Sequence, residues 1–273
     1  MPEKPARTRL KLNPILTKVI LCIAWAFWVC GVLLLTQFLL ARLITWIRDI
    51  LPFYISSSAW QMIYAGLSYG LGLFLIIFIP QKINKKCKTR KSDLGLNELP
   101  TWTDIGLAPV GLIVYVLFSA LLTSIFSIFP WFNISEAQDV GFNNLIVPTD
   151  RVFAFIALVI IAPIAEELIF RGLLYQKIKG LLYKKSEQEN TPKRKSLKKR
   201  ERLAVIVATL ITSIAFGCMH GQWNVGVNVF ALSVVLCILR EITGSIYSGI
   251  LVHMLKNAIA FYLLYIATIG FWC

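Results

Sequence analysis

The chain has 273 residues, of which 57% are hydrophobic and 15% are charged, whereas about a quarter of a soluble domain is charged. The formal net charge is +14, but the basic residues gather in a few polar segments without interleaved aromatic residues, which argues against nucleic-acid binding. This composition excludes an ordinary soluble domain and predicts an all-α fold, a polytopic bundle of transmembrane helices.

Long apolar stretches predict about seven membrane spans, with roughly six or eight as alternatives, because about 20 apolar residues cross a bilayer as a helix. The spans are expected near residues 19–41, 59–79, 107–129, 151–180, 203–219, 227–239 and 245–269, with a connection at 42–58. Pro80 is expected to end the second helix, Asp104 to cap the third, and Thr243-Gly244 to separate the last two.

We expect one integral membrane domain, in which residues 1–150 supply N-terminal helices and loops and residues 151–273 form the core that carries the chemistry. Basic residues predict its orientation, because Lys and Arg concentrate in short cytoplasmic loops. Twenty-two of the 28 Lys and Arg residues lie in the segments 1–18, 81–102 and 176–202. We therefore expect these segments to be cytoplasmic and to contact anionic membrane lipids, and the acidic segment 130–150 to lie outside.

The few ionisable residues inside apolar stretches are candidates for a functional site, because a charge within a bilayer costs about 3 kcal/mol or more. Glu166, Glu167 and Arg171 lie in the fourth predicted span. Glu167 and Arg171 are four residues apart, share a helix face and can pair. Glu166 is rotated by about 100° and lacks a local cation, which suits it to general-base work. The alternative is a structural ion pair with Glu166 facing a water pocket.

Both histidines of the chain lie in apolar segments, His220 at the end of the fifth predicted span and His253 in the seventh. A neutral imidazole can accept a proton from water or bind a metal. His253 and Asn257 are one helical turn apart and can donate hydrogen bonds to one point, as an oxyanion requires. The alternatives are hydrogen-bonded core histidines and an interhelical hydrogen bond from Asn257.

Pro163 lies three residues before Glu166, so it is expected to kink the fourth helix and to free the carbonyl of Val159. Such a break is tolerated where other groups or water satisfy the backbone. Counting along straight helices places Glu166 in the middle of the membrane and His220 near the outer end of the next helix, a mismatch on the order of 10 Å. Helix tilt, the kink, or a late start of the fifth span would close it.

Three motifs follow one another on the predicted spans: EExxxR (Glu166–Arg171), FxxxH (Phe216–His220) and HxxxN (His253–Asn257). In this order, and with the flanking sequence from Ala162 to Gly172, they resemble the CPBP family, which comprises CAAX proteases and bacteriocin-processing enzymes and is also called Abi. The resemblance covers about residues 150–262. The chain departs from the family pattern in its long basic insert between the first two motifs.

The resemblance implies an intramembrane endopeptidase that hydrolyses peptide bonds near the membrane. It implies that Glu166 activates water with assistance from His220. His253 and Asn257 would stabilise the oxyanion. Glu167, with the Arg171 of its motif, would hold the first motif in place.

The use of a metal is open at this point, because the family has been described both as metalloproteases and as glutamate-dependent proteases. Glu166, His220 and His253 are the three ligands that would hold a zinc ion with an open position. The usual zinc-protease signature HExxH is absent from the chain. We therefore expect no cofactor and favour metal-free catalysis, with zinc as the alternative.

The resemblance also implies the partners: a peptide or protein substrate, such as a prenylated protein, a bacteriocin or a pheromone precursor, together with membrane lipids. The expected location is the cell membrane, in a multi-pass arrangement. One rival hypothesis is a non-catalytic bacteriocin immunity protein that binds a toxin. A second is a proton-coupled carrier, because buried Glu, Arg and His also form proton relays. A carrier commonly has internal repeats, and none is found in the sequence.

Overall fold

The computed structural model of the protein describes residues 13–96, 99–136, 138, 140–142, 145–183 and 194–267. Helices and no strands are found among these residues, which confirms the all-α prediction. Seven helices or continuous helical runs are long and apolar enough to cross a membrane, as predicted. Residues 1–12, Asp139, the middle of the predicted basic loop (184–193), the predicted end of the last span (268–269) and the residues after it (270–273) lie outside the described residues.

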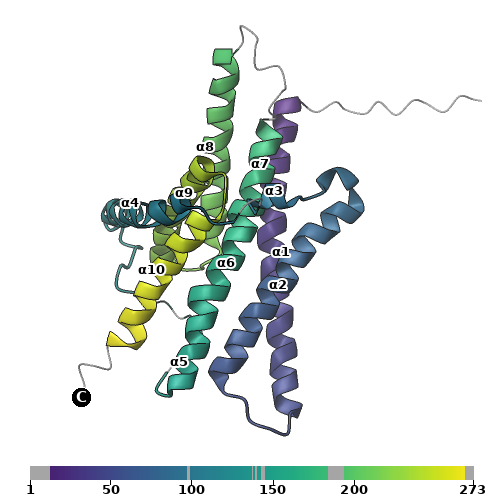
Figure 1. Cartoon of the computed structure of the whole chain (residues 1–273). Helices are drawn as coiled ribbons and strands as arrows, with labels where there is room; N and C mark the ends of the chain where they lie inside the picture. The colour runs from purple at the N-terminus through teal and green to yellow at the C-terminus, as the bar shows by residue number, and fades with distance from the viewer. Residues whose placement is uncertain are drawn as a thin grey trace, which may run out of the picture.

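The first two spans, α1 (Pro14–Ile50) and α2 (Ser57–Ile83), pack against each other and run in opposite directions (Figure 1). Asn13 caps α1, because its side-chain oxygen accepts a hydrogen bond from the amide of Ile15 at 2.9 Å. The helix continues to Ile50, so most of the connection expected at 42–58 is helical. A helix of this length exceeds the thickness of a bilayer, and its C-terminal turns extend beyond the predicted span.

Pro80 does not end α2, contrary to the prediction, but lies inside its last turn. A proline has no N–H and leaves the carbonyl four residues earlier without its helical donor. That carbonyl belongs to Ile76, and it accepts a hydrogen bond from the indole Nε1 of Trp28 on α1 at 3.3 Å. The helix can therefore continue past the proline, because its neighbour supplies the missing donor.

The third span, α4 (Trp102–Phe126), follows a short 3₁₀ turn η1 (Lys85–Cys87) and the single helical turn α3 (Lys91–Leu94). Its N-cap is Thr101, so the prediction of Asp104 as the cap is wrong by three positions. The Asp104 carboxylate accepts from the Thr101 amide at 2.9 Å, and the Asp104 amide donates to the Thr101 hydroxyl at 3.3 Å. This reciprocal capping box satisfies two backbone donors at once.

The fourth span is one continuous run with two wide π-helical segments. Its parts are α5 (Pro148–Phe155), the π-helix η2 (Ile156–Ile161), α6 (Ala162–Glu166), the π-helix η3 (Glu167–Leu174) and α7 (Tyr175–Leu182). The short helix α6 carries both Pro163 and Glu166 between the two π segments. Wide turns of this kind inside a helix are frequent at functional sites.

The last three spans are α8 (Arg194–Cys218), α9 (Trp223–Thr243) and α10 (Tyr247–Tyr265). The helix α8 begins earlier than predicted, because its basic N-terminal residues are helical; Lys and Arg are good helix formers. Gly244 ends α9 in the left-handed conformation, with φ 71°, which confirms the predicted break.

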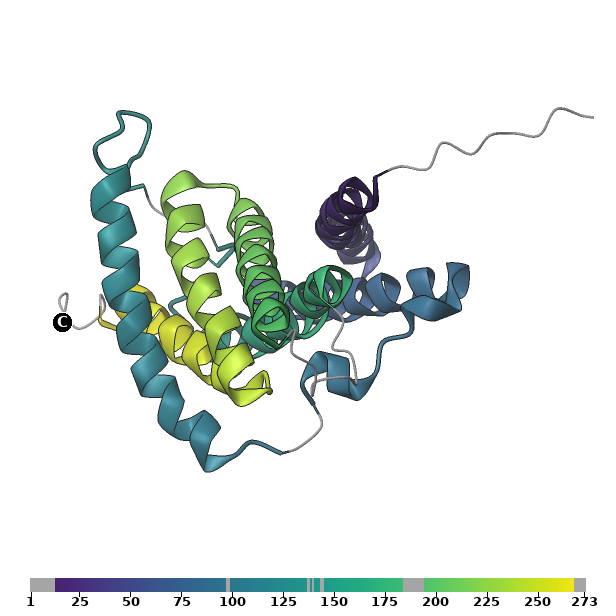
Figure 2. The ribbon, with the colours of Figure 1, turned by 90° about the horizontal axis from the view of Figure 1, so that it is seen from above.

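The helices α9, α8 and α10 form the centre of the bundle, where α9 packs against both of the others. Seen from above, α4 lies on one side of this group and the α1–α2 pair on the opposite side (Figure 2). The helix α4 covers α9 and α10, while α2 packs against α5, η2 and α6. The beginnings of α1 and α8 and the end of α7 lie at the same end of the bundle (Figure 1).

Candidate functional site

The first motif lies at the junction of α6 and η3, where adjacent carboxylates point to different partners. Glu167 is fully buried, and its Oε1 accepts a hydrogen bond from Nη1 of the equally buried Arg171 at 2.9 Å. The predicted pairing of Glu167 with Arg171 is confirmed. The Arg171 guanidinium also lies 4.5 Å from the centre of the Phe216 ring, a cation–π contact. Glu166 takes no part in this ion pair.

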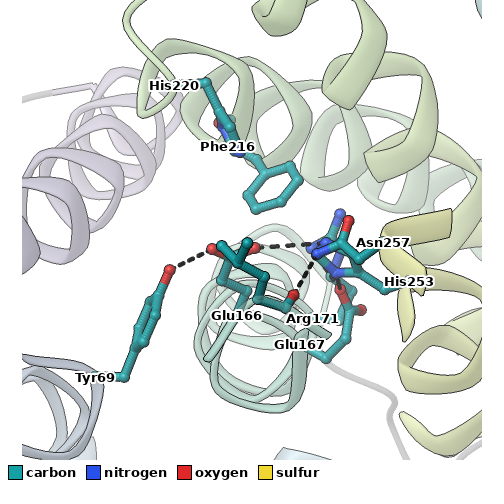
Figure 3. A network of polar contacts seen from close by, with 9 residues as sticks. Tyr69, Glu166, Glu167, Arg171, Phe216, His220, His253 and Asn257 are labelled. Atoms are coloured by element: carbon teal, nitrogen blue, oxygen red, sulfur yellow. Dashed lines mark hydrogen bonds and ion pairs between the residues drawn. The ribbon is translucent and has the colours of Figure 1, made fainter. Parts of the chain in front are cut away.

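His253 on α10 lies between the two carboxylates. Its Nδ1 is 3.1 Å from Glu167 Oε1, and its Nε2 is 3.6 Å from Glu166 Oε2 (Figure 3). Because a carboxylate accepts, Nδ1 carries the proton of that hydrogen bond, and the ring orientation is fixed with Nε2 toward Glu166. A Cβ added at Gly249, one turn earlier on α10, would lie 3.0 Å from Glu167 Oε2. The glycine therefore permits the close approach of α10 to the carboxylate.

Asn257, one turn after His253, donates a hydrogen bond from Nδ2 to the carbonyl of Leu158 at 2.8 Å. Leu158 lies in η2, where the amide of Ala162 bonds to the carbonyl five residues earlier, at Ala157. Continued by one residue, that pattern requires a donor from Pro163 to Leu158, and proline has none. The freed carbonyl is thus that of Leu158, not of Val159 as predicted, because the wide turn shifts the pairing by one residue.

His220 follows the end of α8, and its Nδ1 lies 2.9 Å from the carbonyl oxygen of Phe216. A carbonyl only accepts, so Nδ1 donates this hydrogen bond and Nε2 of the neutral ring keeps its lone pair. Burial lowers the pKa of His220 below its ordinary value, an effect that the nearby Glu166 carboxylate opposes. The imidazole is therefore neutral near pH 7 and can act as an acceptor.

Glu166, His220, His253 and Asn257 all line one cavity of about 400 Å³. A volume in this range is typical of small-molecule and substrate sites. Glu167 and Arg171 are not among its lining residues and lie behind it. The structure therefore brings four of the six predicted residues to one cavity, and the other two do not line it.

The Phe216 ring is the common neighbour of the two histidines. Its centre lies 5.0 Å from the ring centre of His220 and 6.0 Å from that of His253, in edge-on geometry with both.

Among the described residues no group of three or more His, Cys, Asp or Glu side chains is arranged to hold a metal ion. Glu166, His220 and His253, the three predicted zinc ligands, form no such group as they are placed here.

The predicted mismatch in depth between Glu166 and His220 does not occur, because both residues line the same cavity. In Figure 1, α8 begins beyond the end of α7, and its other end stops short of the level of α5. The helix α8 is thus shifted along the bundle relative to the fourth span. A late start of α8 is not the reason, since the helix begins at Arg194.

Tyr69 on α2 is the contact that sequence reasoning missed. Its hydroxyl donates to Glu166 Oε1 at 2.5 Å, and its side chain lines the cavity (Figure 3). Gln37 on α1 and Lys256 on α10 line the same cavity. None of these residues belongs to a recognisable motif. A polar tyrosine in the middle of an apolar span, together with Lys256 directly before Asn257, was the available signal.

Residues 148–259 match the family model described as Type II CAAX prenyl endopeptidase Rce1-like. This segment runs from the start of α5 into α10 and contains all six predicted site residues. No curated protein and no solved structure matches the chain.

Proposed function

We propose that this chain, in which residues 148–259 form an Rce1-like domain of the CAAX protease (CPBP) family, is an intramembrane endopeptidase that uses Glu166 to activate water. The observation that carries the proposal is the shared cavity, whose wall presents Glu166, His220, His253 and Asn257 together. These side chains supply two hydrogen-bond acceptors and two donors around one space. Hydrolysis of a peptide bond needs both kinds of group.

The acceptors bind the attacking water. The Glu166 carboxylate accepts one of its protons, and the unprotonated Nε2 of His220 accepts the other, since Nδ1 of that ring is engaged with the Phe216 carbonyl. With both O–H bonds directed to acceptors, a lone pair of the water oxygen remains for the scissile carbonyl carbon. Glu166 takes the proton as the bond forms and passes it to the leaving amine nitrogen.

The donors bind the developing oxyanion. When His253 carries a proton on both ring nitrogens, Nδ1 stays on Glu167, and the Nε2 proton, which lies beside Glu166 Oε2, is available to an oxyanion in the cavity. An amide has two N–H donors, and Asn257 uses one of them on the Leu158 carbonyl, so the second is available. Both donors are on α10 one turn apart, a fixed spacing that favours the transition state over the planar substrate.

Glu167 and Arg171 orient the donors and do not contact the substrate in this mechanism. The Arg171 guanidinium holds Glu167 Oε1 in place, and the same oxygen fixes the imidazole of His253. A histidine whose ring is oriented by a buried carboxylate keeps one nitrogen directed at its task. The buried ion pair is thus the support of the oxyanion site.

The seven apolar helices make this a multi-pass membrane protein. We propose that it lies in the cell membrane, with the basic ends of α1, α7 and α8 on the cytoplasmic side, as the positive-inside rule predicts. The proposed substrates are peptides or proteins cut near the membrane: a prenylated protein, or a bacteriocin or pheromone precursor. The match to the Rce1-like family model supports a peptide or protein as substrate. The three specific substrates are our proposal.

The test is cleavage of internally quenched peptides by the full chain purified in detergent. One peptide ends in a farnesylated CAAX sequence, and a second has the same residues without the lipid. We expect Glu166→Gln to reduce kcat at least about 1000-fold and His220→Ala about 100-fold. Glu136→Gln is the matched control, because Glu136 is an exposed carboxylate that accepts a hydrogen bond from Gln222 and does not line the cavity.

The four proteins separate the hypotheses. Cleavage by wild type and Glu136→Gln, with a kcat at least about 1000-fold lower in Glu166→Gln, supports the endopeptidase. Equal cleavage by all of them removes Glu166 from catalysis. If wild type cleaves neither peptide at any enzyme concentration but binds a toxin or transports protons, that result contradicts the proposal.

A further inference from the structure

The two oxygens of the Glu166 carboxylate are held by two different helices. Oε1 accepts the hydroxyl proton of Tyr69 on α2 at 2.5 Å, and Oε2 faces His253 Nε2 on α10 at 3.6 Å (Figure 3). Glu166 retains only 13% of its side-chain exposure. Of these two partners, Tyr69 lies outside the segment that matches the family model.

We propose that Tyr69 is a positioning residue, which fixes the carboxylate of Glu166 so that Oε2, and not Oε1, receives the proton of the attacking water. A glutamate side chain has three rotatable bonds. Without the hydrogen bond from Tyr69, the carboxylate of Glu166 could turn about the last of these bonds. A hydrogen bond from the phenol occupies Oε1 and defines the plane of the group. The proposal rests on the function proposed above.

The helix that carries Tyr69 is held firmly enough to serve this purpose. One turn before Tyr69, a Cβ added at Gly66 would lie 4.0 Å from Cδ1 of Ile161, so α2 packs closely on η2 at this level. The helix α2 also packs against α1. Sites built on packed helices hold their geometry better than sites on loops.

The helices α1 and α2 also form part of the cavity wall. Leu33 and Gln37 from α1 line the cavity together with Tyr69. The Rce1-like segment therefore supplies the reacting groups, while α1 and α2 close one side of the space in which they act. This arrangement predicts that a change on α2 alters the chemical step although it lies outside the matched segment.

The experiment compares Tyr69→Phe with Tyr64→Phe in the full chain, with the farnesylated quenched peptide as the probe. Each substitution removes one phenol hydroxyl from α2, but Tyr64 does not line the cavity. A hydrogen bond to a charged group corresponds to roughly a 10- to 100-fold effect. We expect kcat to fall by that factor in Tyr69→Phe with KM unchanged, and both parameters to stay at wild-type values in Tyr64→Phe.

Two further measurements separate positioning from folding. In a Glu166→Gln background, Tyr69→Phe should cause no additional loss, because the group that it positions is gone. The thermal unfolding midpoints of Tyr69→Phe and Tyr64→Phe should agree. Wild-type kcat in Tyr69→Phe overturns the proposal. So does a loss of kcat accompanied by a much lower unfolding midpoint than in Tyr64→Phe.

The outcomes also distinguish this inference from the proposed function. If Glu166→Gln abolishes cleavage and Tyr69→Phe does not reduce it, the endopeptidase stands and the role of Tyr69 fails. If Glu166→Gln cleaves as well as wild type, the proposed function itself fails, and the inference fails with it.

Discussion

The buried ion pair between Glu167 and Arg171 offers a quantitative test of how the site is supported. Both side chains are fully buried, and Glu167 Oε1 is shared between Arg171 Nη1 at 2.9 Å and His253 Nδ1 at 3.1 Å. The substitution Glu167→Gln removes the negative charge and keeps the size of the side chain and one acceptor oxygen. It therefore leaves a buried guanidinium without its counter-ion, in contact with the ring of Phe216.

Removing one partner of a buried pair destabilises a protein by about 3–5 kcal/mol, because the remaining charge is uncompensated. We expect Glu167→Gln to lie near the lower value, about 3 kcal/mol, since the amide oxygen still accepts a hydrogen bond. Replacing both partners by apolar residues, as in Glu167→Leu with Arg171→Met, should cost far less than the single change Glu167→Leu. The difference measures the coupling within the pair.

The assay is unfolding in mixed micelles at increasing sodium dodecyl sulfate, followed by the fluorescence of the eight tryptophans. A free energy of unfolding of Glu167→Gln within about 1 kcal/mol of wild type would refute the reasoning. Strictly additive effects of the two single apolar substitutions would do the same. The double variant should also lose kcat, because His253 no longer has an anionic acceptor at Nδ1.

Substitutions at three other positions have predicted effects on stability. A Cβ at Gly217 would lie 2.9 Å from the carbonyl oxygen of Gly226, so Gly217→Ala should separate α8 from α9 and lower the free energy of unfolding by about 1–3 kcal/mol. Gly70 has open space around it, so Gly70→Ala should raise the free energy of unfolding by about 0.5–1 kcal/mol in the same titration. Asn257→Ala leaves the Leu158 carbonyl without its donor and should cost about 1–3 kcal/mol as well as kcat; unchanged stability would show that the bond is dispensable.

The span count and the pairing of Glu167 with Arg171 could be predicted because both follow from local rules, the length of an apolar helix and the spacing of one turn. The contact of Glu166 with Tyr69 could not, since it joins residues 97 positions apart. A tyrosine in an apolar helix is compatible with many neighbours. Its partner depends on how α2 packs against α6, which no single-sequence pattern specifies.

The errors in the helix boundaries have a similar cause. The rule that places a helix end at Pro80 assumes that a freed carbonyl remains unsatisfied, whereas Trp28 on another helix satisfies it. The shift of the freed carbonyl from Val159 to Leu158 depends on a π-helical turn, which leaves no distinct signature in the sequence. A contact between two helices decided the first outcome, and the local width of the helix decided the second.

The carbonyls freed by Pro80 and Pro163 have a consequence for how the helices of this bundle choose their neighbours. Between helices in a lipid environment the hydrophobic effect provides no preference for one neighbour over another. A carbonyl that has lost its helical donor can accept a hydrogen bond there only from a polar protein group or from trapped water. Pro80 and Pro163 each leave such a carbonyl at one height on one face of a helix, and Trp28 and Asn257 donate to these carbonyls. Each proline thereby specifies which helix packs beside its own and at what height along the bundle. The carbonyl freed by Pro163 selects α10 as the neighbour of the helix that carries Glu166.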